Sequence, residues 1–286
     1  MIDLHTHSAI SDGTDTVLEL VAAARAAGIS VLSLTDHDTM DGVDLAQQVG
    51  AELGVEVLRG MEMSTHLDHQ GTERSIHLLA YGCRADDAEL AAMVGEVRAG
   101  RSQRIPKILE RLAGLGMPLD LAEIEAVSVR AVSIGRPHVA DAMVAHGYVA
   151  SRDEAFHLWL NRGRPGYVSH GSPHLAAAVD AVGKAGGAAV LAHPWGRGTR
   201  SVLSEDAIAD LAATHGLVGI EVDHVDHCDQ DRALLRGLAD DLGLVVTGSS
   251  DYHGLGKTRN PLGVCQTDIS AYQAICQIIE ERGGQP

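Results

Sequence analysis

Histidine and carboxylate side chains recur in this sequence close to where short strand-like segments end. His5 and His7 follow the segment Ile2–Leu4, and Asp12 comes five residues later. Side chains at i and i+2 of a strand project from the same face, so the two imidazoles should lie together. Imidazole and carboxylate groups are ligands of divalent metal ions. A pair of solvated surface histidines would explain one such motif, but the same chemistry returns further along the chain.

Six more candidate ligands follow the same rule. They are His37, Glu62, His77, His193, Asp251 and His253. One divalent ion takes about four to six ligands, so nine protein ligands predict two or three ions that share a bridging carboxylate. The set contains no thiolate, which argues against a structural zinc cage. Its mixed ligands suit manganese, iron, zinc or magnesium, and the share of carboxylates favours manganese.

These residues need a scaffold that brings strand ends together, and the expected elements provide one. Strands are expected at Ile2–Leu4, Val31–Leu34, Val55–Leu58, Ser75–Tyr81, Ala188–Ala192, Gly219–Val222 and Leu244–Thr247. Helices are expected at Thr16–Ala27 (capped by Thr14 or Asp15), Val43–Leu53, Leu175–Ala185, Ile208–His215, Arg232–Leu242 and Ser270–Glu281. Alternating strands and helices favour an α/β fold, and βα barrels build their sites at the carboxyl ends of the strands. We therefore predict a distorted, seven-stranded (βα)7 barrel.

A second unit interrupts this alternation after Arg84. Residues 86–114 predict one long helix, and further short helical pieces follow without a strand. The segment Asn161–Gly166 marks the return to the barrel, since it is rich in glycine, proline and arginine. We predict that residues 1–84 and 165–286 form the barrel and that residues 85–164 form a helical insert, which covers the site as a substrate lid.

The charge of the chain is negative and unevenly distributed. The formal net charge is −17, but residues 85–165 hold 10 basic and 11 acidic residues, so nearly all the excess lies in the barrel. An acidic protein does not coat nucleic acid, because phosphates repel it. A cation-binding barrel beside a nearly neutral insert instead suits a metal-dependent enzyme with an anionic substrate.

Several other classes are excluded by simple patterns. No run of about 18 apolar residues predicts a membrane span, and no secretory signal opens the sequence. The four cysteines are scattered without a CxxC pair, which favours reduced thiols. We expect a cytoplasmic protein, and no feature indicates an obligatory protein partner.

Taken in order, these motifs resemble the PHP (polymerase and histidinol phosphatase) family. The motifs are HxH, TDHDT at Thr35–Thr39, GxE at Gly60–Glu62, His77, AHP at Ala192–Pro194 and SSDYH at Ser249–His253. The resemblance covers residues 1–83 and 165–286, and it implies a PHP barrel with a trinuclear metal site. It implies one ion on His5, His7, Glu62 and Asp251, a second on Asp12, His37 and His253, and a third on Glu62, His77 and His193. We expect three manganese ions, with Asp12, His193 and His253 taking part in catalysis.

The position of the insert, with Gly135-Arg-Pro-His138, is similar to one branch of this family. That branch holds nucleoside 3′,5′-bisphosphate phosphatases and 5′→3′ exoribonucleases of the RNase AM type. The resemblance implies hydrolysis of the 3′-phosphate of a nucleoside 3′,5′-bisphosphate, giving the nucleoside 5′-phosphate, and trimming of short RNA from its 5′ end. The expected partners are therefore a small phosphorylated nucleotide or a short RNA 5′ end.

A basic stripe on the predicted long helix offers contacts for a second phosphate. Arg98, Arg101, Arg104, Lys107 and Arg111 are spaced by 3, 3, 3 and 4 residues. A solvated helix face paired with acids would give the same pattern, but a lid over a phosphatase site favours phosphate binding, for which the arginine fork is suited. We predict substrate contacts from Arg101, Ser102, Arg104, Gly135, Arg136 and His138.

The remaining histidines and acids are given structural roles. We expect His66, His69, His170, His174, His215 and His227 to be solvated rather than metal-bound. Glu221, Asp223 and His224 also end a strand, where they could orient ligands, and we favour the interpretation that they are rim residues. Ser8, Ser249 and Ser250 lack a GxSxG elbow and are expected to act as hydrogen-bonding loop residues.

Three alternatives remain open at the level of sequence. Histidinol phosphate or another phosphomonoester is an alternative substrate. Amidohydrolases also begin with HxH on a strand, but they often use a barrel lysine, and Lys107, Lys184 and Lys257 end no predicted strand. A PHP module kept as a non-catalytic scaffold is the non-enzyme alternative, and the complete ligand set argues against it.

Overall fold

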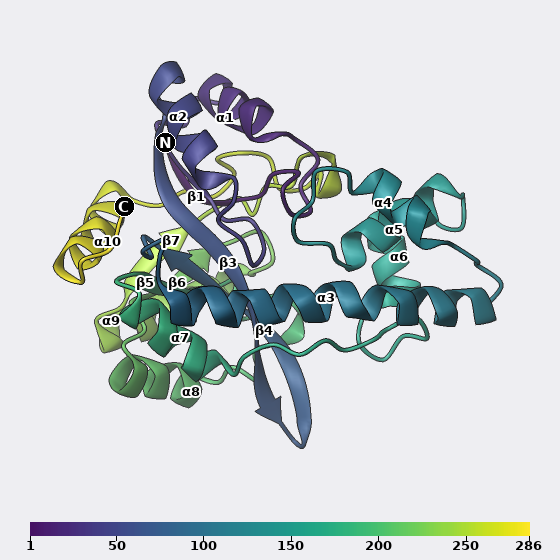
Figure 1. The fold of residues 1–286 in the computed structure, drawn as a ribbon. Coiled ribbons are helices and arrows are strands. Elements are labelled where there is room, and N and C mark those ends of the chain that lie inside the picture. The colour runs from purple at the N-terminus through teal and green to yellow at the C-terminus, as the bar shows by residue number, and fades with distance from the viewer.

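The computed structural model describes residues 1–286 and has one seven-stranded sheet with the strands in chain order, β1 to β7. The strands are β1 (Ile2–Thr6), β2 (Val31–Leu34), β3 (Glu56–His69), β4 (Thr72–Tyr81), β5 (Ala188–Ala192), β6 (Gly219–Asp223) and β7 (Val245–Gly248). The sheet curls into a nearly closed barrel (Figure 1). At the open seam the His7 amide donates to Tyr252 O at 2.9 Å, and the Thr267 amide donates to Ile2 O at 3.0 Å. The predicted α/β barrel of seven strands is confirmed.

The helices fall into two sets, those beside the barrel strands and those of the segment between β4 and β5 (Figure 1). Beside the barrel are α1 (Val17–Ala26), α2 (Val43–Leu53), α7 (Leu175–Lys184), α8 (Glu205–Asp210), α9 (Asp229–Leu242) and α10 (Ile269–Glu281). Between β4 and β5 are α3 (Ala88–Gly114), α4 (Leu121–Val127), α5 (Arg136–Ala145) and α6 (Arg152–Ala155). No helix is both long enough and apolar enough to cross a membrane.

Local signals explain where the first helices begin and end. Thr16, rather than the predicted Thr14 or Asp15, caps α1, because its hydroxyl accepts from the Glu19 amide while Glu19 accepts from the Thr16 amide. Gly54 ends α2 in the left-handed conformation, at φ 71°. The capping box of α1 and the glycine after α2 thus fix where these helices begin and end, and with that the length of the neighbouring connections.

A regular (βα)7 barrel has strands that all run in one direction, and β4 departs from this arrangement. This strand is antiparallel to both β3 and β5, and β3 continues to His69 instead of ending at Leu58. The reason is a long hairpin in which Met61, Met63 and Ile76 are buried against the helices. Residues between them project to the other side of the sheet, into the barrel. Because β4 runs backwards, its early residues lie at the same barrel end as the carboxyl ends of the parallel strands.

The barrel interior is filled at one end and polar at the other. Leu4, Leu79 and Val190 pack with Tyr272 and Ile275 of α10 in one apolar cluster. This packing places α10 under the interior of the barrel. The opposite end, where β1, β2, β5 and β7 terminate, holds the polar residues described below.

The segment between β4 and β5 has an apolar core of its own. Ile108, Ile124, Val139, Met143 and Leu160 are members of this buried cluster. Helix α3 belongs to both units, since its early residues are buried in the barrel core and its later ones in the second core. The packing therefore changes along α3, and the domain boundaries at 84/85 and 164/165 remain a prediction.

Candidate metal centre

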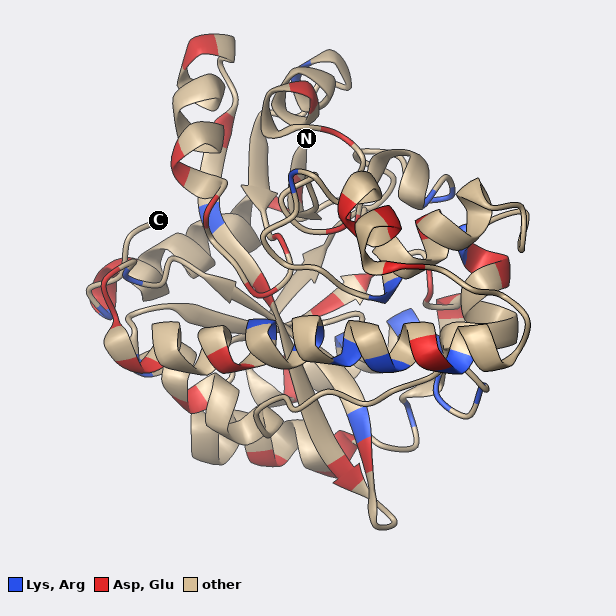
Figure 2. Ribbon diagram, turned by 45° about the vertical axis from the view of Figure 1, so that its right-hand side comes forward, with Lys and Arg blue, Asp and Glu red and all other residues tan.

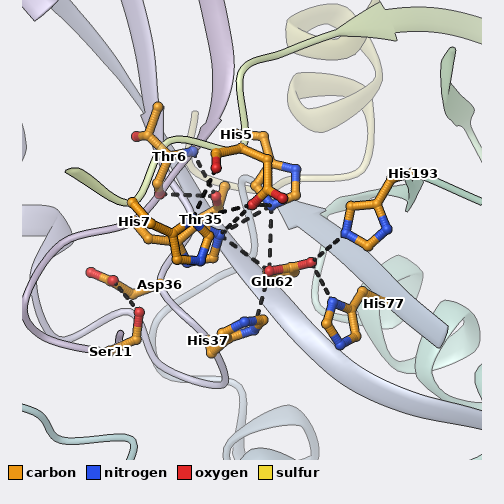
Figure 3. A network of polar contacts seen from close by, with 12 residues as sticks. His5, Thr6, His7, Ser11, Thr35, Asp36, His37, Glu62, His77 and His193 are labelled. Atoms are coloured by element: carbon orange, nitrogen blue, oxygen red, sulfur yellow. Dashed lines mark hydrogen bonds and ion pairs between the residues drawn. The ribbon is translucent and has the colours of Figure 1, made fainter. Parts of the chain in front are cut away.

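Nine buried or half-buried candidate ligand residues lie at the polar end of the barrel, and five of their histidines surround the Glu62 carboxylate (Figure 3). They are the nine predicted from the sequence: His5, His7, Asp12, His37, Glu62, His77, His193, Asp251 and His253. We call this set the metal nest. One Glu62 oxygen lies 3.3 Å from His5 Nε2, 3.2 Å from His7 Nε2 and 3.1 Å from His37 Nδ1. The other lies 2.6 Å from His77 Nδ1 and 3.2 Å from His193 Nε2.

The donor atoms divide into three overlapping groups, in each of which all atoms lie within 4.8 Å of one another. The groups are His5, His7, Glu62 and Asp251; His7, Asp12, His37 and His253; and His37, Glu62 and His77. Glu62 belongs to two of them, as a bridging carboxylate would. His193 approaches the third group through Glu62.

The nest fits divalent cations by charge and by its unpartnered atoms. Buried and without a hydrogen-bond partner are His7 Nδ1, His37 Nδ1 and Asp251 Oδ1. Burial raises the pKa of Glu62 and Asp251, but neighbouring imidazoles at Glu62, and Lys257 with neighbouring imidazoles at Asp251, outweigh it and hold the pKa of both carboxyls well below the usual value. Three buried carboxylates that stay ionised need positive charge beside them, and the His-, Asp- and Glu-rich groups are suited to divalent metal ions.

The histidines differ in their proton affinity. Burial lowers the pKa of His37 and of His193 well below the usual value, and it lowers the pKa of His253 to about 4. Burial also disfavours charge on His5 and His7, yet nearby carboxylates raise both pKa values, that of His7 to about 9. Metal ions bind neutral imidazole, so an ion held by His5 and His7 would take the place of the protons that balance the carboxylates.

Unusual backbone geometry presents two of the ligands. His193 and Asp251 have φ of 31° and 54°, in the left-handed region that non-glycine residues rarely adopt. The His193 amide donates to Glu221 Oε2 at 2.8 Å, which helps to hold this conformation. Such strain persists where surrounding contacts overdetermine it, and it is common at functional sites.

Glu221 and His224 lie behind the ligands, and the prediction that they are rim residues is wrong. Glu221 is fully buried, with Oε1 3.0 Å from His5 Nδ1. His224 Nε2 lies 3.4 Å from Asp251 Oδ2. Period-two alternation would have revealed Glu221, because its neighbours Ile220 and Val222 pack outward in the helix-facing core. Asp223 does lie at the rim, where it binds Arg236.

The two aspartates of the TDHDT motif support the ligand loops. Asp36 accepts from the Ser8 amide at 2.9 Å and from its hydroxyl at 2.6 Å, which confirms Ser8 as a loop residue. Asp38 accepts from the Ser64 amide at 2.7 Å and lies 3.2 Å from Arg101 Nε. Asp38 therefore connects the barrel to the segment between β4 and β5.

Two cations that sequence reasoning missed contact the ligand Asp251. Lys257 Nζ lies 2.5 Å from Asp251 Oδ2, and Arg197 Nη2 lies 3.3 Å from the same oxygen. Lys257 ends no strand, but the loop after His253 folds it back toward the nest. Only the tertiary arrangement of this loop brings the two together.

Three arginines form a second polar site beside the nest, and we call it the arginine cluster. Its members are Arg101, Arg104 and Arg136. Arg101 Nη1 donates to Ser133 Oγ at 2.7 Å, Arg104 Nη1 lies 2.9 Å from His170 Nδ1, and Arg136 Nη1 donates to Leu160 O at 2.9 Å. Figure 2 shows basic residues along the middle and later turns of α3.

The cluster concentrates positive charge with little compensation. Burial, followed by Arg136 and Arg101, lowers the pKa of Arg104 well below its usual value. Burial lowers the pKa of Arg136 to about 10, and Arg101 adds to the effect. A Cβ on Gly135 would lie 3.7 Å from Arg104 Nη2, so this glycine lies directly against the guanidinium groups. Such an arrangement suits an anion.

The other residues predicted to contact the substrate differ from one another in exposure. Ser102 is exposed, and His138 is buried with its Nδ1 accepting from the Gly135 amide at 3.0 Å. Of the stripe, Lys107 and Arg111 are exposed, because a spacing of three residues turns by −60° at each step around a helix and leaves the inner face. Arg98 is 3.9 Å from Asp41.

The histidines expected to be solvated are all outside the three ligand groups. Five of the six nevertheless have hydrogen-bond partners, and two of these five lie close to the site. His227 is buried, its Nδ1 2.8 Å from Val222 O, and His170 contacts Arg104. Burial and neighbouring arginines lower the pKa of His170 to about 2, so it stays neutral beside the cluster.

Comparison with known proteins gives consistent results. The family described as the PHP domain matches residues 3–118. A 3′,5′-nucleoside bisphosphate phosphatase of Chromobacterium violaceum is 34% identical, over 92% of this chain and 90% of the relative. A phosphoribosyl 1,2-cyclic phosphate 1,2-diphosphodiesterase of Eggerthella lenta is 33% identical, over 88% and 94%. A 5′-3′ exoribonuclease of Haemophilus influenzae is 30% identical, over 88% and 89%.

A solved structure from Bifidobacterium adolescentis, provisionally described as a metal-dependent phosphoesterase, has a similar fold. Its TM-score is 0.91 at 34% identity, and the match covers 97% of this chain and 96% of that one. The similarity therefore extends over barrel and insert alike.

Proposed function

This chain belongs to the PHP domain family, and we propose that it is a metal-dependent phosphatase that hydrolyses the 3′-phosphate of nucleoside 3′,5′-bisphosphates and releases nucleoside 5′-phosphates. One observation carries the proposal. Asp38 joins the two sites, because it binds Ser64 on the same strand as Glu62 and also lies 3.2 Å from Arg101 of the arginine cluster. A substrate with two phosphates could occupy both sites at once.

The names of the relatives support a substrate with two phosphates. The C. violaceum relative is named for a nucleoside that carries two phosphates, and the E. lenta relative is named for a phosphoribosyl group with a cyclic phosphate. Their common element is a phosphate ester next to a further phosphate on the same sugar. The arginine cluster offers that further phosphate a site of its own.

We propose that the nest holds three manganese ions. His5, His7, Glu62 and Asp251 would hold one, Asp12, His37 and His253 a second, and Glu62, His77 and His193 a third. When bound, closely spaced divalent ions make a water molecule more acidic and stabilise charge on the phosphoryl oxygens. We assign a part in catalysis to Asp12, His193 and His253. Of these, His253 Nε2 lies 3.3 Å from Asp12 Oδ1.

The second phosphate would be bound by the insert. We assign this role to Arg101, Ser102, Arg104, Gly135, Arg136 and His138. A short RNA with a 5′-phosphate and a nucleoside 3′,5′-bisphosphate both carry a phosphate group at the 5′ position. The same cluster would therefore place the first internucleotide bond of RNA at the nest, and we propose 5′→3′ trimming of short RNA as a related activity.

The test is a phosphate-release assay with manganese-loaded protein and adenosine 3′,5′-bisphosphate. We expect adenosine 5′-phosphate and one phosphate as products, two to three manganese ions per chain by elemental analysis, and oxygen from labelled water in the released phosphate. Release of the 5′-phosphate instead, or preference for histidinol phosphate over the bisphosphate, would contradict the proposal. A phosphorylated enzyme trapped on quenching would contradict direct attack by water.

A further inference from the structure

The insert holds the loop after β1 at three consecutive residues. The Val132 amide donates to Ile10 O at 2.8 Å, the imidazole of His138 faces the backbone of Ser11, and Arg152 Nη1 donates to Asp12 O at 2.8 Å. The third contact involves the peptide of a nest residue. It is therefore the one through which the insert can influence the ligands directly.

Arg152 is itself rigidly held. Its Nε and Nη2 donate to the two carboxylate oxygens of Asp141 at 2.5 and 2.6 Å, a bidentate pair that fixes the plane of the guanidinium. The Arg152 side chain is 15% exposed. A Cβ on Gly256 would lie 2.2 Å from Arg152 Nη1, so the absence of a side chain there makes room for the guanidinium. Gly256 follows the ligand His253 by three residues, and Arg152 therefore touches two of the loops that carry ligands.

The Asp12 carbonyl has no other hydrogen-bond donor. Elsewhere the loop is tied to itself, since Ser8 O accepts from the Ser11 and Gly13 amides. The Asp12 carboxylate lies 3.3 Å from His253 and 3.7 Å from His37, so a rotation of the Asp12 peptide would displace it from both imidazoles. The peptide between Asp12 and Gly13 is thus held at both ends, by Ser8 O at its N–H and by Arg152 at its carbonyl, and the contact with Arg152 is the one that the insert supplies.

We propose that Arg152 is a positioning residue for the metal centre. Through the Asp12 carbonyl it orients the Asp12 carboxylate toward His37 and His253, so that the affinity for the ion held by these three residues depends on the docked insert. Asp141 acts one step further away, because it orients Arg152. The inference rests on the proposed function in so far as the nest binds manganese, and it does not depend on which phosphate ester is hydrolysed.

The experiment compares manganese binding in four full-length proteins, the wild type and the variants Arg152→Met, Asp141→Asn and Arg152→Met/Asp141→Asn. Arg164→Met is the matched control, since Arg164 is an exposed insert arginine whose side chain has no polar partner. Titration followed by the signal of free aqueous Mn²⁺ resolves the binding steps. Asp12→Ala identifies the step to which Asp12 contributes.

Loss of an outer partner of a metal ligand typically costs about 10- to 100-fold in metal affinity. We expect this loss for Arg152→Met in the Asp12-dependent step alone, with the other steps and Arg164→Met unchanged. The double variant should keep the full loss, whereas Asp141→Asn alone should lose only a few-fold. An Arg152→Met isotherm equal to that of the wild type would overturn the proposal.

The double variant separates positioning from a structural role. If Arg152 only forms an ion pair within the insert, removal of both partners should restore binding, because no charge is left uncompensated. Restoration would therefore also overturn the proposal. If circular dichroism shows that Arg152→Met is unfolded, Arg152→Lys is measured in its place. Manganese binding equal to that of the wild type in a folded Arg152→Lys protein would then overturn the role given to the arginine fork. Wild-type protein that binds manganese but does not hydrolyse the bisphosphate would refute only the proposed substrate.

Discussion

The metal nest and the arginine cluster lie side by side and are built in opposite ways. In the nest, other protein groups orient the ligands: Glu221 binds His5 and the His193 amide, and the Asp251 carbonyl lies 2.9 Å from His253 Nδ1. In the cluster, Arg104 Nε is buried without a partner. Both sites thus keep buried atoms without a partner, but those of the nest are imidazole and carboxylate atoms that suit a cation, whereas that of the cluster is a guanidinium donor that suits an anion.

The two sites also carry opposite charge imbalances. The nest gathers three buried carboxylates, and the cluster gathers three guanidinium groups near the single carboxylate of Asp38. Buried like charges cost free energy unless a partner of opposite charge arrives. Under the proposed function this difference corresponds to a division of labour, in which the barrel would hold the cations that promote the reaction and the insert would select an anion. Each of the following changes tests one side of that division.

The largest effect is expected for Glu62→Gln, because Glu62 contacts five of the nest histidines. The amide keeps the size of the side chain but is a poor metal ligand. Metal ions supply several kcal/mol of transition-state stabilisation, so kcat/KM should fall by at least about 10³-fold on every phosphate ester. Elemental analysis should show fewer bound ions. Activity within tenfold of the wild type would remove Glu62 from the centre of the reaction.

Next in size are Arg101→Ala and Arg136→Ala in the cluster. A charge-assisted hydrogen bond contributes about 1.5–3 kcal/mol, so each should lower kcat/KM for adenosine 3′,5′-bisphosphate by about 10- to 100-fold. An aryl phosphate has no second phosphate and should be hydrolysed at nearly the wild-type rate. Equal losses on both substrates would instead indicate a folding defect or a role in the nest.

The fold was predictable where each residue's environment follows from its neighbours in sequence. Helix α2 was predicted at its observed bounds, Val43–Leu53, because its periodicity and Gly54 are local signals. The direction of β4 was not, since it depends on a 14-residue strand that pairs in a hairpin. Gly60 looks like the end of a strand in sequence, and only the pairing of Gly60 with Tyr81 shows that the strand continues.

The residues of the candidate site were likewise predictable only in part. The nest residues could be found because strand ends converge in a barrel and metal ligands are restricted to few residue types. Glu221 was identified but wrongly assigned to the rim, and the contacts of Lys257 and Arg152 were missed, since each of the three acts through another residue and its role depends on tertiary distances. The stripe on α3 was identified as a unit, but only the structure distinguishes its buried members from its exposed ones.

A moderate effect is expected for Glu221→Gln, which tests whether the second layer of the nest matters. The amide keeps an acceptor for the His193 amide but loses the charge that lies 3.0 Å from His5 Nδ1. We expect manganese affinity to fall by about tenfold, at the lower end of what outer partners contribute. Saturating manganese should restore most of the activity. A loss that manganese does not restore would place Glu221 in the reaction itself.

The smallest effect is expected for Lys107→Ala, which tests whether substrate contacts extend along α3 beyond the arginine cluster. Lys107 continues the spacing of Arg101 and Arg104, but it is exposed and its ammonium group has no partner. Substitutions of exposed side chains of this kind usually change stability by less than about 0.5 kcal/mol. Solvent ions also largely screen an exposed charge that lies more than a Debye length from a bound phosphate, which is about 8 Å at physiological ionic strength. Therefore kcat/KM for the bisphosphate should change by less than about twofold, and Arg101→Ala in the same helix gives the reference for a direct contact. A loss comparable to that of Arg101→Ala would mean that the whole stripe binds the substrate. The bound substrate would then extend beyond the three arginines of the cluster, as the longer backbone of an RNA substrate would.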